Sequence, residues 1–197
     1  MTESNRGIVF LDRDGTLNVE VNRLCSPDRL ELIPRAGEAV RRLNHAGFLA
    51  VLVTNQSIIA RGECSEARLE EIHDRLKKLL AEEGASLDAI YYCPHHPDPD
   101  PDPDPESDAA IARFKIQCDC RKPGTGMIKR ALADFSLVSS DAWMIGDTTV
   151  DLKTAQNAGI RSILVHTGYA GTDRRWTVQP DHEFSDLYEA VEFVISS

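Results

Sequence analysis

Two carboxylates, Asp12 and Asp14, directly follow a short apolar run at residues 7–11. Such a run predicts a strand buried on both faces, and open parallel α/β sheets bind ligands at the carboxyl ends of their strands. Alternate residues of an extended chain point the same way, so both carboxylates can address one site. A carboxylate can attack phosphorus and divide phosphate-ester hydrolysis into two steps. A lone aspartate pair is also typical of a solvated turn. Further motifs are therefore needed to distinguish a catalytic site from such a turn.

Three further polar motifs stand at comparable places in the chain. Residues 54–57 (TNQS) follow the apolar run 48–53, and residues 146–151 (GDTTVD) follow another at 142–145. Residues 121–123 (RKP) supply positive charge before a predicted helix. Taken singly, they are compatible with an ordinary turn, a helix start and a solvated surface pair. Because parallel strands end at the same edge of a sheet, we expect all of these motifs to meet there.

This combination of residue types fits hydrolysis of a phosphomonoester. We predict that Asp12 is the nucleophile and that Asp14 protonates the leaving oxygen and then deprotonates water, a role worth about 10²–10⁴-fold in rate. Two carboxylates would repel a dianionic phosphate, so the site needs a hard cation such as Mg²⁺, with Asp12 and Asp147 as ligands. The remaining phosphate oxygens are expected to contact neutral donors and one cation: Thr54, Asn55 and Lys122.

Strand and helix patterns alternate along the chain, which predicts a doubly wound, mostly parallel α/β sheet in a single domain of residues 1–197. Five buried strands are predicted, at residues 7–11, 48–53, 89–92, 142–145 and 162–165. Amphipathic patterns predict helices at residues 36–46, 65–84, 127–135 and 151–158. A helix and a strand fill the segment between the first two motifs, so a capless architecture is expected.

Composition and charge exclude several classes of function. The chain has 22 basic and 32 acidic residues, for a net charge of −10, which argues against a nucleic-acid-binding surface. It lacks the run of about 20 apolar residues that spans a bilayer, and its first residues do not resemble a secretion signal, so we expect a cytoplasmic protein. Cys93, Cys118 and Cys120 stand near histidines, which in a reducing compartment indicates metal binding rather than disulfides.

The four motifs together resemble those of the haloacid-dehalogenase superfamily of phosphatases, over nearly the whole chain. Within it, residues 91–97 (YYCPHHP) and 118–123 (CDCRKP) are similar to D-glycero-D-manno-heptose 1,7-bisphosphate 7-phosphatases and their histidinol-phosphatase relatives. The resemblance implies a small phosphorylated sugar as substrate and Mg²⁺ held by Asp12, the backbone carbonyl of Asp14, and Asp147. Asp151 is expected to stabilise the residues that hold Mg²⁺ and phosphate, without contacting either of them itself. Further substrate-binding residues are predicted from the same motifs: Gln56, Ser57 and Arg121.

The resemblance also implies a structural Zn²⁺ in a loop at residues 93–120. The matching ligands are Cys93, His95, Cys118 and Cys120, a set that suits a closed tetrahedral site. This loop contains a Pro/Asp-rich insertion at 97–105, which we expect to be extended and solvated. The zinc loop and a second loop carrying Glu20, Asn22 and Arg23 are predicted to form the rim of the site. Asn22 and Arg23 stand where heptose-specific relatives usually carry Gly-Tyr.

Two alternatives to a heptose bisphosphatase remain open from the sequence. The nearer one is a phosphatase for histidinol phosphate or another small sugar phosphate, because those relatives share the zinc loop. The more distant one is a signalling receiver domain, which also carries a phosphorylated aspartate, a threonine and a lysine. Receivers are shorter and lack the Cys/His cluster. We expect a monomer without nucleic-acid or membrane partners.

Overall fold

A computed structural model describes residues 6–97 and 111–197 of the chain. Its centre is a six-stranded sheet in the order β3-β2-β1-β4-β5-β6, in which every neighbouring pair is parallel. The strands are β1 (Gly7–Leu11), β2 (Phe48–Asn55), β3 (Ala89–Cys93), β4 (Ala142–Gly146), β5 (Arg161–Val165) and β6 (His182–Phe184). The predicted parallel sheet is therefore confirmed.

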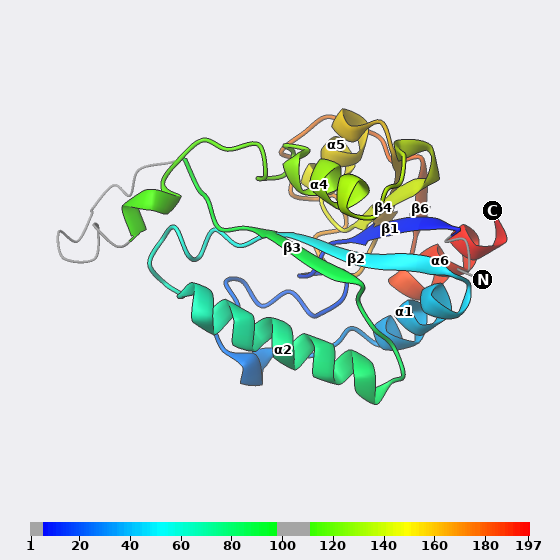
Figure 1. Ribbon diagram of the computed structural model, residues 1–197, viewed down its shortest axis with the longest axis horizontal. Coiled ribbons are helices and arrows are strands. Elements are labelled where there is room, and N and C mark those ends of the chain that lie inside the picture. Colours follow the sequence, from blue (N-terminus) through cyan, green and yellow to red (C-terminus); the bar gives the residue numbers. More distant parts are fainter. Residues whose placement is uncertain (1–5, 98–110) are drawn as a thin grey trace.

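Helices cover both faces of this sheet (Figure 1). One face carries α1 (Ala36–His45), α2 (Glu66–Glu82) and α6 (Leu187–Ser196), and the other carries α4 (Gly126–Asp134) and α5 (Thr149–Ala158). Alternate residues of β1 enter the two cores: Val9 and Leu11 pack with α1, α2 and α6, whereas Ile8 and Phe10 pack with α4 and α5. Burial on both faces explains why the strands read as continuous apolar runs rather than alternating ones.

Local signals place most element boundaries within two residues of the prediction. The hydroxyl of Ser65 caps α2 by accepting from the Arg68 N–H at 3.1 Å. Gly47, after α1, and Gly84, after α2, adopt φ values of 79° and 74°, the left-handed conformation that ends helices at glycine. Helix α5 begins earlier than predicted, at Thr149, because the side chains of Thr148 and Asp151 form a reciprocal capping box.

The prediction missed the last strand and the last helix. Strand β6 is only three residues long and lies at the edge of the sheet, so it carries little of the pattern of a buried strand. Helix α6 does have a readable pattern, since its buried residues recur at helical spacing: Leu187, Ala190, Val191 and Val194. These side chains join the same core as α1.

The carboxyl edge of the sheet is covered by loops. In the described part of the chain no separate domain lies over it, in agreement with the capless prediction. Residues 12–35 form an irregular segment with one short 3-10 helix, Pro27–Arg29.

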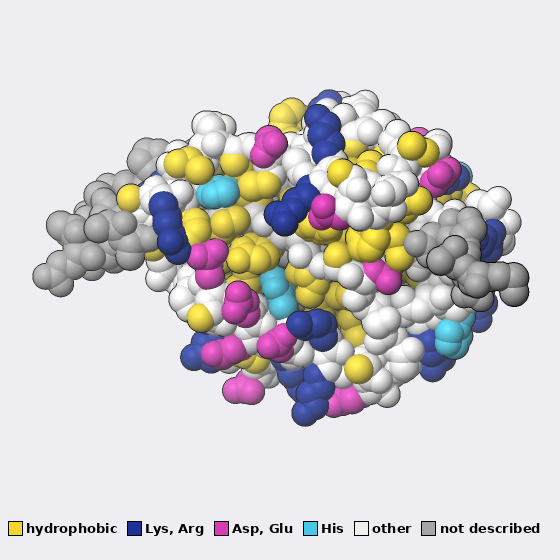
Figure 2. All heavy atoms as spheres, viewed as in Figure 1, with side chains coloured by type: hydrophobic (Ala, Val, Ile, Leu, Met, Phe, Trp, Pro, Cys, Tyr) yellow, Lys and Arg dark blue, Asp and Glu magenta, His cyan; other side chains and the backbone are white. Residues whose placement is uncertain are grey.

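Residues 98–105 of the Pro/Asp-rich insertion lie outside the described residues. Acidic and basic side chains lie over α2, whereas hydrophobic ones gather over β3 (Figure 2). No helix within 6–97 or 111–197 is long and apolar enough to cross a membrane.

Candidate active site

All four motifs meet in one cavity of about 410 Å³ at the carboxyl ends of the central strands. Side chains predicted as catalytic or substrate-binding line this cavity: Asp12, Asp14, Glu20, Thr54, Asn55, Ser57, Arg121 and Lys122. Strands β2, β1 and β4 are adjacent, and each ends at the start of a motif. Their parallel pairing is what brings together residues that lie up to 135 positions apart in the sequence, from Asp12 to Asp147.

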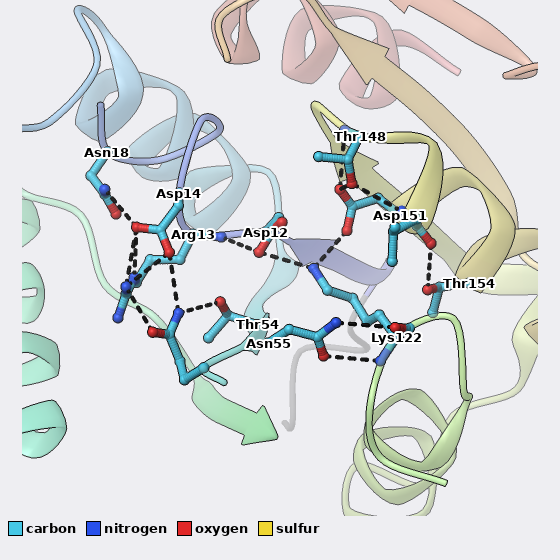
Figure 3. A network of polar contacts seen from close by, with 12 residues as sticks. Asp12, Arg13, Asp14, Asn18, Thr54, Asn55, Lys122, Thr148, Asp151 and Thr154 are labelled. Carbon is cyan, nitrogen blue, oxygen red and sulfur yellow. Dashed lines mark hydrogen bonds and ion pairs between the residues drawn. The ribbon is translucent and has the colours of Figure 1, made fainter. Parts of the chain in front are cut away.

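Lys122 lies between two carboxylates at the floor of the cavity (Figure 3). Its Nζ is 2.9 Å from Asp12 Oδ1 and 2.6 Å from Asp151 Oδ1, and its side chain is only 3% exposed. Burial, and then repulsion from Asp151, raise the pKa of Asp12 well above its usual value, while Lys122 acts in the opposite direction. Burial also disfavours the Lys122 ammonium, but Asp12 and Asp151 hold its pKa above the usual value. Lys122 therefore remains charged.

Asp147 adds a third carboxylate and leaves the site with excess negative charge. It is fully buried, and its Oδ2 accepts from the Tyr169 N–H at 2.7 Å. Its Oδ1 has no hydrogen-bond partner in the described part of the chain. Burial, followed by repulsion from Asp151, raises the pKa of Asp147 to about 7. One lysine thus faces three carboxylates.

This excess charge and the orphaned oxygen fit a bound cation. One ligand oxygen each from Asp12, Asp147 and Asp151 lie within 4.8 Å of one another. Carboxylate oxygens are the ligands that Mg²⁺ prefers. The backbone also approaches closely, since a Cβ added at Gly15 or at Gly168 would lie 2.3 or 2.1 Å from Asp147 Oδ2. Glycine at these positions makes room for the Asp147 carboxylate.

Asp14 faces a different set of partners from Asp12. The fully buried Arg13 donates from Nη2 to Asp14 Oδ2 at 2.8 Å, and further bonds come from Asn18 Nδ2 at 3.0 Å and Gln56 Nε2 at 3.1 Å (Figure 3). Burial alone would raise the pKa of Asp14, but Arg13 and these hydrogen bonds together hold it below its usual value. Both aspartates line one cavity as expected, but Asp14 is a stabilised carboxylate here, in the form that accepts a proton.

The TNQS segment divides into residues that face the cavity and residues that hold it in shape. Asn55 exchanges two hydrogen bonds with the backbone of Lys122, accepting its N–H at 2.9 Å and donating to its carbonyl at 3.0 Å. Gln56 is 3% exposed, and its amide is shared among Thr54, Asp14 and Arg13. Asn55 therefore fixes Lys122, and Gln56 fixes Asp14.

The predicted rim loop lies beside this cavity. Glu20 lines it, and burial raises the pKa of its carboxyl group. Asn22 and Arg23 both adopt left-handed backbone conformations, with φ values of 49° and 63°. The guanidinium of Arg23 pairs with Glu63 at 2.6 Å. The positive charge of Arg23 is thus offset by a neighbour within the chain.

The four predicted zinc ligands lie close together, next to the RKP segment that follows Cys120 in the sequence. One donor atom from each of Cys93, His95, Cys118 and Cys120 lies within 4.8 Å of the others. Tetrahedral zinc with Zn–S bonds of about 2.3 Å places its sulfurs about 3.8 Å apart. Cys118 Sγ lies near that separation, at 3.6 Å from Cys93 Sγ and 3.4 Å from Cys120 Sγ, whereas Cys93 and Cys120 are closer, at 3.0 Å. The donor set fits Zn²⁺. Arg121, next in sequence, donates to the His95 carbonyl at 3.1 Å.

The loop that follows β5, at residues 166–176, contributes to the site although none of the four sequence motifs includes it. Its Tyr169, Asp173 and Arg175 line the cavity. The loop is tied to the site because the Gly171 N–H donates to the Asp147 carbonyl at 2.8 Å and Thr167 Oγ1 donates to the Gly15 carbonyl at 2.6 Å. A usable signal was present: the loop follows a buried strand at the same sheet edge as the four motifs.

Comparison with known proteins agrees with this geometry. A HAD-hydrolase-like family model matches residues 119–190. The D-glycero-D-manno-heptose-1,7-bisphosphate 7-phosphatase of Chlorobaculum tepidum is 41% identical over 192 residues, covering 93% of this chain and 92% of the relative. The Escherichia coli K12 D-glycero-beta-D-manno-heptose-1,7-bisphosphate 7-phosphatase is 38% identical over 161 residues, covering 81% and 79% of the two chains.

Solved structures give the same result. The crystal structure of D,D-heptose 1,7-bisphosphate phosphatase from B. bronchiseptica, complexed with magnesium and phosphate, is 31% identical, with a TM-score of 0.82 over 96% of this chain and 98% of that one. The fold and the site thus define a HAD-like phosphatase, and the receiver-domain alternative is rejected. The chain belongs to the family of the D-glycero-D-manno-heptose-1,7-bisphosphate 7-phosphatases.

Proposed function

We propose that this chain removes the 7-phosphate of D-glycero-D-manno-heptose 1,7-bisphosphate, leaving the 1-phosphate in place. The observation that carries the proposal is the 41% identity to a named 7-phosphatase over 93% of the chain. Asp12, Asp14 and Lys122 line one cavity, and a carboxylate oxygen of the buried Asp147 lies within 4.8 Å of one of Asp12. This arrangement supports the proposal, because these residue types suit phosphoryl transfer.

In the proposed reaction Asp12 attacks phosphorus and the bond from phosphorus to the sugar oxygen breaks, which leaves the phosphoryl group on Asp12. Asp14 gives a proton to the departing oxygen. In the second step Asp14 takes a proton from water, which attacks phosphorus and releases inorganic phosphate with Asp12 regenerated. Asp14 must be protonated before the first step. The arrival of a negatively charged substrate favours that protonation, because nearby like charge raises the pKa of a carboxyl group.

The other site residues have supporting roles in this proposal. Lys122 neutralises charge that develops on the phosphoryl oxygens, with neutral donors such as Thr54 and Ser57 beside it. Asp12, the Asp14 carbonyl and Asp147 would hold Mg²⁺, which would supply positive charge to offset the negative charge of the site and the phosphate. Asp151 holds Lys122 in place at 2.6 Å.

We also propose that the Cys/His cluster binds one structural zinc and that the protein acts as a cytoplasmic monomer with a single domain, residues 1–197. The four donors that a closed tetrahedral zinc site needs all come from this one chain, so that site is complete without a second copy. Thiol ligands need a reducing compartment to stay free of disulfides. Light scattering of the purified protein tests the monomer, because a mass near 43.6 kDa, twice the chain mass of 21.8 kDa, would contradict it.

Kinetics on a substrate panel test the assignment. The panel contains the α and β anomers of heptose 1,7-bisphosphate, histidinol phosphate and simple hexose phosphates, each assayed with Mg²⁺. We expect the highest kcat/KM for a heptose bisphosphate. A higher value for histidinol phosphate would overturn the proposed substrate in favour of the alternative that shares the zinc loop.

A matched variant tests the proposed nucleophile. Asp12→Asn keeps the size of the side chain but replaces the nucleophilic carboxylate by a neutral, poorly nucleophilic amide, so we expect kcat to fall by at least about 1,000-fold with the fold unchanged by circular dichroism. Trapping of a phosphorylated wild-type protein after rapid acid quench should disappear in this variant. Residual turnover above a few per cent would remove Asp12 from the nucleophilic role.

A further inference from the structure

The loop after β5, at residues 166–176, is hydrogen-bonded to Asp147 at two points. The Tyr169 N–H donates to Asp147 Oδ2 at 2.7 Å, and the Gly171 N–H donates to the Asp147 backbone carbonyl at 2.8 Å. Both donors are backbone groups, so their positions depend on the conformation of the loop. The other carboxylate oxygen, Oδ1, is buried and has no hydrogen-bond partner among the described residues. The loop therefore occupies one oxygen of Asp147 and leaves the other for a cation.

Two glycines bring this loop, Asp147 and the segment after β1 into direct contact. A Cβ added at Gly168 would lie 2.1 Å from Asp147 Oδ2 and 2.7 Å from the Cα of Gly15. A Cβ added at Gly15 would lie 2.3 Å from the same carboxylate oxygen. Because no atom fits between these groups, a shift of the loop relative to Gly15 must also displace the Asp147 carboxylate. The spacing between the loop and Gly15 thus controls where Asp147 lies.

Thr167 is the side chain that connects the loop to Gly15. Its Oγ1 donates to the Gly15 carbonyl at 2.6 Å, across 152 positions of sequence. On its other side, Gly15 is fixed by its own N–H, which donates to the Asn18 carbonyl at 2.8 Å. Within residues 6–97 and 111–197, no other side chain of the loop hydrogen-bonds to residues 12–18. The position of the loop relative to Gly15 therefore depends on one hydroxyl group.

This connection joins two of the groups that would hold Mg²⁺. The Asp14 carbonyl and the Gly15 N–H belong to one planar peptide group, so fixing Gly15 restricts the direction of that carbonyl. The loop in turn restricts Asp147. Mg²⁺ requires near-ideal octahedral placement of its oxygen ligands, so small displacements of either group lower the affinity.

We propose that Thr167 is a positioning residue for the metal site. Its hydroxyl holds the loop after β5 against Gly15, and this keeps Asp147 where its free oxygen would bind Mg²⁺. Thr167 is not among the described residues that line the catalytic cavity, so it acts through Asp147 rather than on the substrate. The inference rests on the proposed Mg²⁺-dependent reaction and extends it to a residue outside the four motifs.

Mg²⁺ binding to the purified enzyme without substrate, measured by isothermal titration calorimetry, tests this inference. Thr167→Val keeps the branched shape but removes the hydroxyl, and should raise the Kd for Mg²⁺ by about 10-fold, as is usual for groups that orient metal ligands. Thr167→Ala should behave in the same way. Thr167→Ser retains the hydroxyl and should bind Mg²⁺ within about threefold of wild type. In the phosphatase assay, Thr167→Val should need about 10-fold more Mg²⁺ for half-maximal rate, with kcat at saturating Mg²⁺ within about threefold of wild type.

Thr172, in the same loop, offers a matched control. Its hydroxyl also donates at 2.6 Å, but to the Tyr169 carbonyl within the loop, and the Thr172 N–H donates to that same carbonyl at 2.8 Å. Thr172→Val should therefore leave the Kd for Mg²⁺ unchanged. A Kd that rises equally in Thr172→Val and Thr167→Val would overturn the inference, because the effect would then be a general loosening of the loop.

Two other results would also overturn it: a Thr167→Val protein that binds Mg²⁺ like wild type, or a Thr167→Ser protein as weak as Thr167→Val. The titration contains no substrate, so its outcome does not depend on which phosphate ester is hydrolysed. Failure of the heptose assignment in the substrate panel would leave this result standing. A wild-type enzyme that binds no Mg²⁺ would overturn both this inference and the proposed metal dependence.

Discussion

At the scale of single residues, the charge balance around Lys122 governs both stability and chemistry. The Lys122 side chain is 3% exposed, and its ammonium group forms ion pairs with two carboxylates at once, those of Asp12 and Asp151. Removing one partner of a buried ion pair leaves an uncompensated charge, which costs far more than the pair itself contributes. Lys122 therefore stabilises the fold around the carboxylates, and in the proposed reaction it also neutralises charge on the transferred phosphoryl group.

Replacing Lys122 by methionine tests this double role. Without metal, in EDTA, we expect Lys122→Met to lower the free energy of unfolding by about 3–5 kcal/mol, measured by urea denaturation. With Mg²⁺, kcat/KM should fall by at least about 100-fold. Adding Asp151→Asn should restore part of the stability but none of the activity. Lys129→Met, at an exposed position of α4, is the control and should change neither quantity.

His73 provides a residue-scale prediction for pH dependence. It is 5% exposed on α2, its Nε2 has no hydrogen-bond partner in the described part of the chain, and its ring lies 5.7 Å from that of Tyr92. Burial, and then repulsion from Arg13, lower its pKa from 6.5 to about 3. Below pH 6.5 the unfolded chain therefore binds a proton at His73 that the folded chain does not. The free energy of unfolding falls as the pH is lowered through this window.

The effect is measurable by urea denaturation at pH 7 and pH 5. His73 should contribute a loss of roughly 2 kcal/mol over this interval, at about 1.4 kcal/mol per pH unit below 6.5. His73→Leu should remove that contribution, whereas His45→Leu, at an exposed position in α1, should retain it. Identical losses in wild type and His73→Leu would contradict the prediction.

At the scale of elements, loops rather than helices and strands decide the shape of the site. The zinc loop is tied to the RKP segment through the hydrogen bond from Arg121 to the His95 carbonyl. The loop after β5 is held at the start of α5, where Asp173 accepts from the Thr149 N–H at 2.8 Å and from its hydroxyl at 2.7 Å. Arg121 follows the zinc loop and Arg175 belongs to the loop after β5, and both line the catalytic cavity. Disturbing the conformation of either loop should therefore raise KM more than it lowers kcat.

Zinc removal tests the first of these connections. Protein purified without added metal should contain about one zinc per chain, and Cys118→Ser should lose it. Because the zinc loop positions Arg121, the variant should show a higher KM for the preferred substrate with a smaller change in kcat. Cys25→Ser, outside the cluster, should keep its zinc and its KM. Wild-type protein that contains no zinc by atomic spectroscopy would refute the structural site.

At the scale of the whole molecule, the net charge of −10 gives a misleading picture of the ligand. An anion is bound against that sign because basic groups and the expected cation are concentrated at one sheet edge. The sheet in turn depends on α6, at the end of the chain, which packs against α1 and closes one of the two cores.

Helix α6 should therefore be required for stability without taking part in the reaction. Leu187 is 1% exposed, and we expect Leu187→Ala to lower the free energy of unfolding by about 2–5 kcal/mol, measured by urea denaturation. The kcat/KM of the folded protein should stay within about twofold of wild type. Val138→Ala, at a residue that is 62% exposed, is the control and should change the stability by less than about 0.5 kcal/mol.

Much of the fold and the core of the site could be predicted from the sequence because they depend on local patterns. Apolar runs mark the buried strands, and the Asp12, Thr54 and Asp147 segments each follow such a run, so strand direction alone brings them to one edge. Strand β6 could not be predicted, because a three-residue edge strand is too short to show a distinctive period of apolar residues. Helix α6, by contrast, has a helical period that can be read from its sequence.

Which side chains become partners depends on the tertiary structure. The sequence shows two aspartates, a lysine and a Cys/His set at spacings that suit phosphoryl transfer and zinc binding. It does not show that Gln56 holds Asp14, that Asp151 shares Lys122 with Asp12, or that Arg175 lines the same cavity as Arg121. These arrangements join segments about 30 to 110 residues apart, and their energies depend on burial and distance, which no local pattern encodes.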